Sequence, residues 1–202
     1  MKVMVTGHRP NKIGGYSTES PLRKWVNNAI RFALKSEMER MWQLEKIATY
    51  HKTPKEAPPQ KTAITGMALG VDQAFAEVAL ELEWSVQAFV PGRWQPSKWP
   101  EHSREAYFSL LRRIKAAHTV DDGFEQPIIV CSDADYNPSL LHHRNTMMVE
   151  ACDVAIAVWD GSEGGTHDAV MKLARSERPI YHINPAKRSL GWWGKVPEWT
   201  MP

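Results

Sequence analysis

The chain has 202 residues, of which 25 are lysine or arginine and 23 are aspartate or glutamate, so its formal net charge is +2. This length suits one domain with a sizeable core, and the near balance of charge gives no electrostatic case for binding nucleic acid or a membrane surface. The absence of a long apolar stretch, of a signal-peptide pattern and of metal-ligand spacing around the 2 cysteines predicts a cytoplasmic protein with no membrane partner, no metal and no cofactor.

The first half of the chain alternates short apolar runs with segments of helical periodicity. A first strand is expected to end at Gly7, and Ser20-Pro21 is expected to start a long helix, because proline is favoured at the first helical position. Apolar residues at helical spacing extend that helix to about Ile47. The expected elements are strand Lys2–Thr6, helix Leu22–Ile47, strand Thr62–Thr65, helix Val71–Leu82, strand Trp84–Val90 and helix Glu101–Ala116.

The second half continues the alternation after a segment, 121–138, whose pattern is weak. Short strands are expected at 118–120 and, at a sheet edge, at 128–130. The run 154–159 is continuously apolar, as in a central parallel strand. The remaining expected elements are helix Leu140–Ala151, strand Val154–Trp159, helix Thr166–Ser176 and strand Pro179–Ile183. Strands that alternate with helices predict a doubly wound, mostly parallel sheet.

Three loops follow predicted strands and precede or approach helices. Two are glycine-rich, Thr65-Gly66-Met67-Ala68-Leu69-Gly70-Val71-Asp72 and Gly161-Ser162-Glu163-Gly164-Gly165-Thr166-His167-Asp168, and the third is Gly7-His8-Arg9. Since the carboxyl ends of parallel strands meet at one sheet edge, helix N-termini and backbone N–H groups are expected to converge there. This arrangement predicts a site for a nucleotide or a nucleotide-derived ligand.

These segments resemble motifs of the SLOG superfamily, which unites the DNA-processing protein DprA, the lonely-guy phosphoribohydrolases and the YspA-like or YpsA-like proteins. The run 65–72 is similar to the DprA-type turn, and Arg144-Asn145 followed by Asp153, a strand and Gly164-Gly165-Thr166 is similar to the lonely-guy pattern. The opening Thr6-Gly7-His8-Arg9-Pro10 is most similar to the YspA-like branch. Three motifs in the same order, each at a strand end, are fairly specific.

The resemblance implies an α/β fold, a Rossmann-like three-layer sandwich with a mostly parallel sheet, as a single domain over residues 1–185. The tryptophan-rich residues 186–202, with Trp192, Trp193 and Trp199, are expected to pack on this domain or on a partner subunit. The sequence leaves open whether the chain forms a homodimer.

The loop residues carry both a ligand-binding and a structural interpretation. Gly165 and Thr166 belong to a phosphate cradle or to an ordinary turn in which Thr166 caps the helix. Asp72 either binds a ribose hydroxyl or caps its helix. Arg9 either pairs with phosphate or lies in a structural loop. For Arg144 the resemblance implies a contact with phosphate or sugar, and the alternative is a solvated helix residue. The residues expected to bind the ligand are Gly7, His8, Arg9, Gly66, Met67, Gly70, Asp72, Arg144, Asn145, Gly161, Gly164, Gly165 and Thr166.

A catalytic role is an alternative. Lonely-guy enzymes place a catalytic glutamate three residues after the threonine of their turn, and here that position is Ala169. Glu163 or Asp168 would have to replace it to stabilise charge or activate water in N-glycosidic cleavage, but Asp168 also suits the first turn of a helix, where it favours the macrodipole.

Three functions therefore stand in order. The first is binding of a nucleotide or an ADP-ribose-like ligand, and the second is a nucleotide N-glycosidase or phosphoribohydrolase. The third is a DprA-like binder of single-stranded DNA, against which the near-neutral charge weighs, so that nucleic acid is not expected as a partner.

Overall fold

A seven-stranded sheet forms the centre of the computed structural model, which describes residues 1–52, 60–119 and 126–193. The strand order is β4-β3-β2-β1-β5-β6-β7. All neighbouring strands are parallel except β6 and β7, which pair antiparallel. The strands are β1 Lys2–Gly7, β2 Thr62–Thr65, β3 Ser85–Val90, β4 Ile128–Val130, β5 Val154–Val158, β6 Ile180–Asn184 and β7 Ser189–Trp193.

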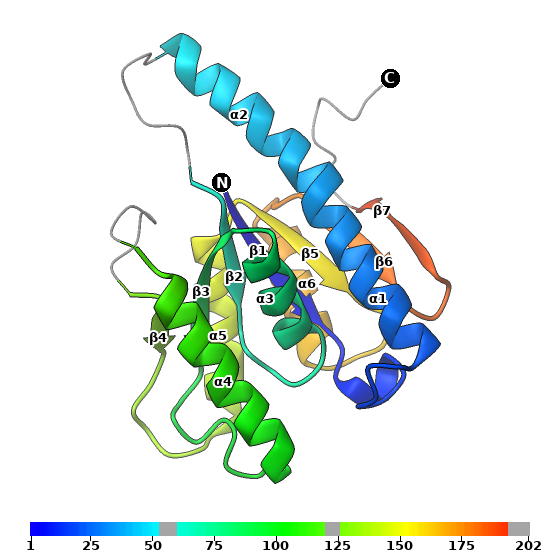
Figure 1. Cartoon of the computed structure of the whole chain (residues 1–202), viewed down its shortest axis with the longest axis vertical. Helices are drawn as coiled ribbons and strands as arrows, with labels where there is room; N and C mark the ends of the chain where they lie inside the picture. Colours follow the sequence, from blue (N-terminus) through cyan, green and yellow to red (C-terminus); the bar gives the residue numbers. More distant parts are fainter. Residues whose placement is uncertain (53–59, 120–125, 194–202) are drawn as a thin grey trace.

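Helices cover both faces of this sheet (Figure 1). The buried apolar side chains form two cores, one beneath each layer of helices. The helices of the first layer are α1 Pro21–Phe32, α3 Val71–Glu81 and α4 Glu101–Ala117, and those of the second are α5 Pro138–Ala151 and α6 Gly165–Arg175. This is the predicted α/β, Rossmann-like three-layer sandwich with a mostly parallel sheet.

The central strand β5 shows why the sheet needs two layers. Val154, Ile156 and Val158 belong to the first core, whereas Ala155 and Ala157 belong to the second. All five residues are buried. The continuous apolar run that the sequence shows is therefore explained by burial on both faces, as expected for a parallel strand with helices above and below it.

The long predicted helix is longer than expected and is not uniform. It runs as α1, a π-helical segment Ala33–Met38 and α2 Glu39–Lys52. In Figure 1, α2 projects beyond the sheet, at the end of the molecule where the N-terminus lies. The apolar side chains that pack on the first core end near Trp42, and Leu44 and Ile47 are exposed. The periodicity thus marks a helix whose second part leaves the core.

Of the two short strands expected in the segment 118–130, one needs correction and one is confirmed. Residues 118 and 119 do not form the strand expected at 118–120, and residue 120 lies outside the described residues. The edge strand expected at 128–130 is confirmed as β4. Among the described residues, no helix is both long and apolar enough to cross a bilayer.

The strand β7 lies inside the segment that the sequence predicts as a tail, and it was not predicted as a strand. Trp192 packs edge-on against Tyr181 of β6, with ring centroids 5.3 Å apart, and its indole N–H donates to Glu37 Oε2 at 3.0 Å. These contacts hold β7 on the sheet and on the helical segment before α2. Trp199 lies outside the described residues.

Candidate functional site

The sheet reverses its order at β1, because the chain builds outward from β1 to β2, β3 and β4 on one side and to β5 and β6 on the other. In open α/β sheets, ligands bind in the crevice at the carboxyl ends of the strands on either side of such a switch point. The structure has a cavity of 130 Å³ at this point, which we call the central cavity. Its lining is Met4, Val5, Thr6, Gly7, Arg9, Ala68, Asp72, Leu141, Arg144, Asn145, Met148, Gly165 and Thr166.

Arg144 of α5 is the main charged group of the central cavity. Its side chain is buried, and its Nε and Nη1 atoms have no hydrogen-bond partner among the residues that the structure describes. The nearest opposite charge is Asp72 Oδ2, 3.7 Å from Nη1, which is an ion-pair distance but too long for a hydrogen bond. Buried donors without partners are costly and rare in proteins. This guanidinium is therefore short of acceptors, and an anion in the cavity would supply them.

Asp72 of α3 is the ion-pair partner of Arg144. Burial raises the pKa of its carboxyl group, while Arg144 and hydrogen bonds from backbone N–H groups act in the opposite direction. One of those bonds comes from Ala68 N at 3.2 Å. Burial likewise lowers the pKa of Arg144, against the effect of Asp72. Because Asp72 lies beyond hydrogen-bond distance of Nη1, the pair leaves two guanidinium donors, Nε and Nη1, without an acceptor.

Gly66 is required where it is because it lies directly against Arg144. A Cβ atom built on Gly66 would be 1.5 Å from Arg144 Nη1 and 2.9 Å from Asp72 Oδ2. A Cβ atom built on Gly70, which has φ +104°, would likewise be only 2.5 Å from the backbone oxygen of His8. The glycines of the 65–72 turn therefore make space for Arg144 and for the β1 loop, and they do not themselves line the central cavity.

The glycine turn after β5 brings the start of α6 to the same cavity. Gly161 and Gly164 have positive φ angles, of 95° and 134°, which explains the glycine at each position. The helix N-cap is Gly164, so Thr166 lies inside the first turn and does not cap the helix. Gly165 and Thr166 line the cavity at a helix N-terminus, where backbone N–H groups favour an anion.

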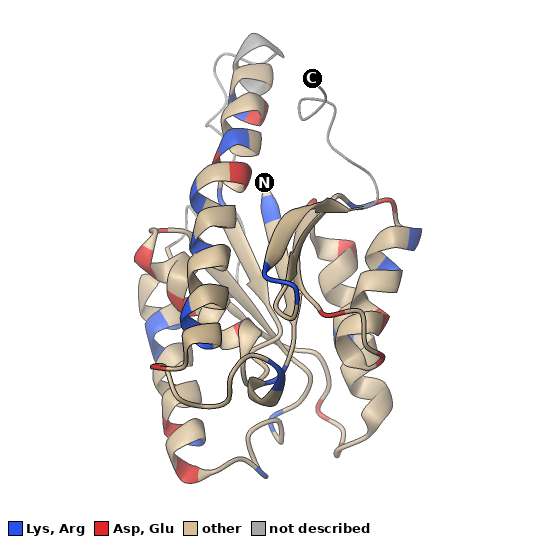
Figure 2. Cartoon of the chain, turned by 90° about the vertical axis from the view of Figure 1, so that its right-hand side faces the viewer, with Lys and Arg blue, Asp and Glu red and all other residues tan. Residues whose placement is uncertain are grey.

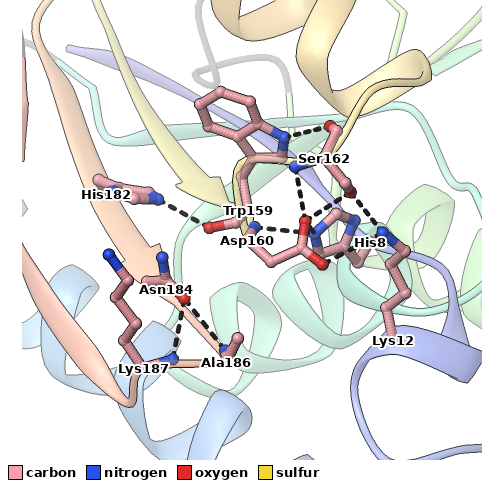
Figure 3. Close-up of polar contacts among 9 residues, drawn as sticks. All are labelled: His8, Lys12, Trp159, Asp160, Ser162, His182, Asn184, Ala186 and Lys187. Atoms are coloured by element: carbon pink, nitrogen blue, oxygen red, sulfur yellow. Dashed lines mark hydrogen bonds and ion pairs between the residues drawn. The ribbon is translucent and has the colours of Figure 1, made fainter.

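The turn is tied to β1 by a cluster of polar side chains (Figure 3). Asp160 Oδ2 accepts a hydrogen bond from Lys12 Nζ at 3.1 Å, and its Oδ1 accepts one from Ser162 N at 2.9 Å. Partial burial acts to raise the pKa of Asp160, but bonds from Ser162 and Lys12 lower it overall. The indole of Trp159 donates to Ser162 O at 2.7 Å. These contacts fix the turn that positions α6.

His8 belongs to this cluster and not to the lining of the central cavity. Its ring is buried, and Nε2 lies 2.9 Å from Asp160 N and 2.8 Å from Asp160 Oδ1. The unprotonated nitrogen accepts from the amide, whereas the protonated nitrogen donates to the carboxylate. Burial lowers the pKa of His8, while Asp160 acts to raise it and Lys12 to lower it. We assign the neutral ring, because the pKa is lowered overall.

This assignment predicts a pH dependence of stability. Because the pKa of His8 is lower in the folded protein than in the unfolded chain, where it is about 6.5, the unfolded state binds the proton more tightly. The contribution of neutral His8 to the free energy of unfolding is therefore complete above the unfolded-state pKa, and it is lost as the pH falls below that pKa. Thermal unfolding between about pH 7.5 and about pH 5 should show a larger loss for the wild type than for His8→Gln, which keeps an acceptor that does not titrate. An equal loss in both proteins would contradict the assignment.

The structure thus gathers part of the predicted set. The predicted residues that line the central cavity are Gly7, Arg9, Asp72, Arg144, Asn145, Gly165 and Thr166. The predicted residues outside its lining are His8, Gly66, Met67, Gly70, Gly161, Gly164, Glu163 and Asp168. Sequence reasoning missed six lining residues, five of them apolar and without a chemical signal: Met4, Val5, Thr6, Ala68, Leu141 and Met148. It also missed the Asp160–Lys12 pair, which spans 148 positions.

The two carboxylates considered for catalysis lie away from the cavity lining. Asp168 Oδ2 accepts hydrogen bonds from Lys172 Nζ at 2.9 Å and Asn145 Nδ2 at 3.1 Å, and lies 3.1 Å from His142 Nδ1. Partial burial acts to raise the pKa of Asp168, but these bonds lower it overall. The carboxylate therefore joins α5 to α6, a structural role. Glu163 is exposed.

The chain resembles known proteins in sequence and in fold. No protein-family model matches the chain. Over 190 residues it is 24% identical to a UPF0398 protein of Bacillus anthracis, a match that covers 90% of this chain and 88% of the relative. Its fold is similar to that of DNA processing protein A from Helicobacter pylori, with a TM-score of 0.53 and 16% identity over 91% of this chain and 65% of that one.

These similarities agree with the predicted Rossmann-like fold, and they do not single out the YspA-like branch. They also correct one expectation. Nucleic acid was not expected as a partner because the net charge is near zero, but the Helicobacter protein is described by its single-stranded DNA binding mode. Acidic and basic residues are interspersed along the helices in Figure 2. The net charge of the whole chain therefore does not reveal local basic residues such as Arg9 and Arg144 at the central cavity.

Proposed function

We propose that this chain binds single-stranded nucleic acid and holds one backbone phosphate in the central cavity. Arg144 supplies buried donors, Arg9 supplies a second cation at the exposed side, and Gly165 and Thr166 present the N-terminus of α6. Phosphate groups bind where guanidinium groups and helix N-termini converge.

The observation that carries the proposal is that Arg144 lines the cavity and that its buried Nε and Nη1 atoms have no hydrogen-bond partner among the described residues. The similarity in fold to a single-stranded DNA binding protein favours a strand over other phosphate-bearing ligands. A volume of 130 Å³ accommodates one phosphate with part of a sugar, and not a folded nucleic acid. A flexible strand passing over the sheet edge can present its phosphates one at a time.

A free nucleotide is the second candidate, because the same cavity would hold its phosphate, including that of an ADP-ribose-like molecule. The N-glycosidase alternative is not proposed, since Asp168 is engaged by Lys172 and Asn145 and Glu163 is exposed. Assignment to the YspA-like branch rests only on the run 6–10 of the sequence.

The experiment is equilibrium binding of a fluorescent oligodeoxythymidine at several salt concentrations, with unlabelled duplex and thymidine monophosphate as competitors. We expect tighter binding of the single strand than of either competitor. For each tenfold rise in salt concentration, the observed association constant should fall by about 0.7 logarithmic units per contacted phosphate. Competition by the mononucleotide at equal concentration would favour the second candidate. No binding at low salt would exclude the proposed function.

A further inference from the structure

A second cavity, of 200 Å³, adjoins the central cavity and shares Arg9 and Leu141 with it. We call it the aromatic cavity. Its other walls come from the loop after β3, with Trp94, Lys98 and Trp99, and from Tyr136 just before α5. Two stretches of chain about 40 residues apart therefore meet beside the proposed phosphate position, and they bring three aromatic rings with them.

The rings are held in fixed positions. Trp94 donates its indole N–H to Ala134 O at 3.0 Å, and its ring meets Tyr136 edge-on with centroids 4.9 Å apart. Trp99 packs edge-on against the buried Tyr107 at 5.3 Å. Tyr136 is nevertheless 55% exposed. Because the Tyr136 ring is fixed by its neighbours and still exposed, it offers a preformed surface on which another planar group can pack.

The side chains around the aromatic cavity carry positive charge, which favours an anionic occupant. Lys98 Nζ lies 5.6 Å from the centre of the Tyr136 ring, and Arg9 stands between the two cavities. Among the described residues that line this cavity, none is acidic. An aromatic surface with cations at its border suits a planar group attached to a phosphate, because bases stack on aromatic rings while cations follow the backbone.

We propose that the aromatic cavity receives a nucleobase of the strand whose phosphate occupies the central cavity, a proposal that rests on the proposed function. Its volume is below the about 300 Å³ at which pockets for drug-sized ligands begin, which fits a single planar ring system. Gln95 would be the natural group to read base edges, but its amide donates to Gly66 O at 2.9 Å and accepts from Tyr107 at 3.3 Å. With Gln95 engaged elsewhere, recognition mainly by stacking makes the subsite tolerant of base identity.

The test compares an oligodeoxythymidine with an abasic strand of the same length and the same number of phosphates. The wild type should bind the abasic strand more weakly, by about 5- to 10-fold for one stacked base. Tyr136→Ala should lower the affinity for the base-bearing strand by the same factor and leave the affinity for the abasic strand unchanged. Tyr136→Phe, which keeps the ring, should bind as the wild type does.

Tyr16→Ala is the matched control, since Tyr16 is 59% exposed and lies outside the lining of both cavities. It should leave the affinity for both strands unchanged. Equal wild-type affinities for the two strands, or an equal effect of Tyr136→Ala on both, would overturn the base subsite while leaving phosphate binding in place. Failure of the wild type to bind either strand would instead overturn the proposed function.

Discussion

Removing the charge of Arg144 together with that of Asp72 is expected to lower the affinity for a single-stranded oligonucleotide by about 10- to 100-fold. Hydrogen bonds to a charged partner contribute about 1.5–3 kcal/mol each, and the buried Nε and Nη1 atoms have no other partner that would compensate. The double variant Arg144→Gln/Asp72→Asn serves for this test. The single replacement of Arg144 would leave a buried, uncompensated carboxylate and would cost about 3–5 kcal/mol of stability.

Binding should be measured by fluorescence anisotropy on protein whose cooperative thermal unfolding has been verified. Arg178→Gln is the matched control, because Arg178 also has a buried Nε without a partner but lies outside both cavities. The control should bind as the wild type does. A folded double variant with wild-type affinity would show that the phosphate does not contact Arg144.

The second large effect is expected at Gly66. A methyl group there would occupy the position of Arg144 Nη1, so that Gly66→Ala must displace the guanidinium or shift the turn. Overpacking of this kind costs about 1–3 kcal/mol, and the displaced arginine can no longer reach the central cavity. We therefore expect a lower unfolding temperature and a loss of oligonucleotide affinity similar to that of the double variant Arg144→Gln/Asp72→Asn.

Gly191→Ala separates this effect from a general cost of losing a glycine. A Cβ atom on Gly191 would meet no atom within 4 Å, and Gly191 lies in β7, away from both cavities. Calorimetry and the same binding assay should show little change for this variant. Unaltered binding by Gly66→Ala would indicate that the 65–72 turn does not position Arg144 for the ligand.

The centre of the sheet was predictable because β5 is buried on both faces and leaves an uninterrupted apolar run at 154–158. The same signal failed for β7, where Leu190 and Trp193 remain exposed and Gly191 interrupts the run. Its pairing with β6 depends on long-range contacts, such as that of Trp192 with Glu37, which the local pattern does not encode. An antiparallel strand at a sheet edge is thus the element that periodicity detects least well.

Within the site, the sequence indicated which loops converge but not what each residue does there. Glycine spacing pointed correctly to the sheet edge, yet Gly66 and Gly70 serve the packing of Arg144 and the β1 loop, which only the close distances reveal. Arg144 could equally have been a solvated helix residue by its position in the chain. Its burial follows from the face of α5 that meets the sheet, a property of packing and not of composition.

A crystal structure of the protein with a short oligodeoxythymidine tests the central claim most directly. We predict a backbone phosphate in the central cavity, with oxygens about 2.7–2.9 Å from Arg144 Nε or Nη1 and facing the N-terminus of α6. A strand bound elsewhere on the molecule, with Arg144 still lacking partners, would contradict the account.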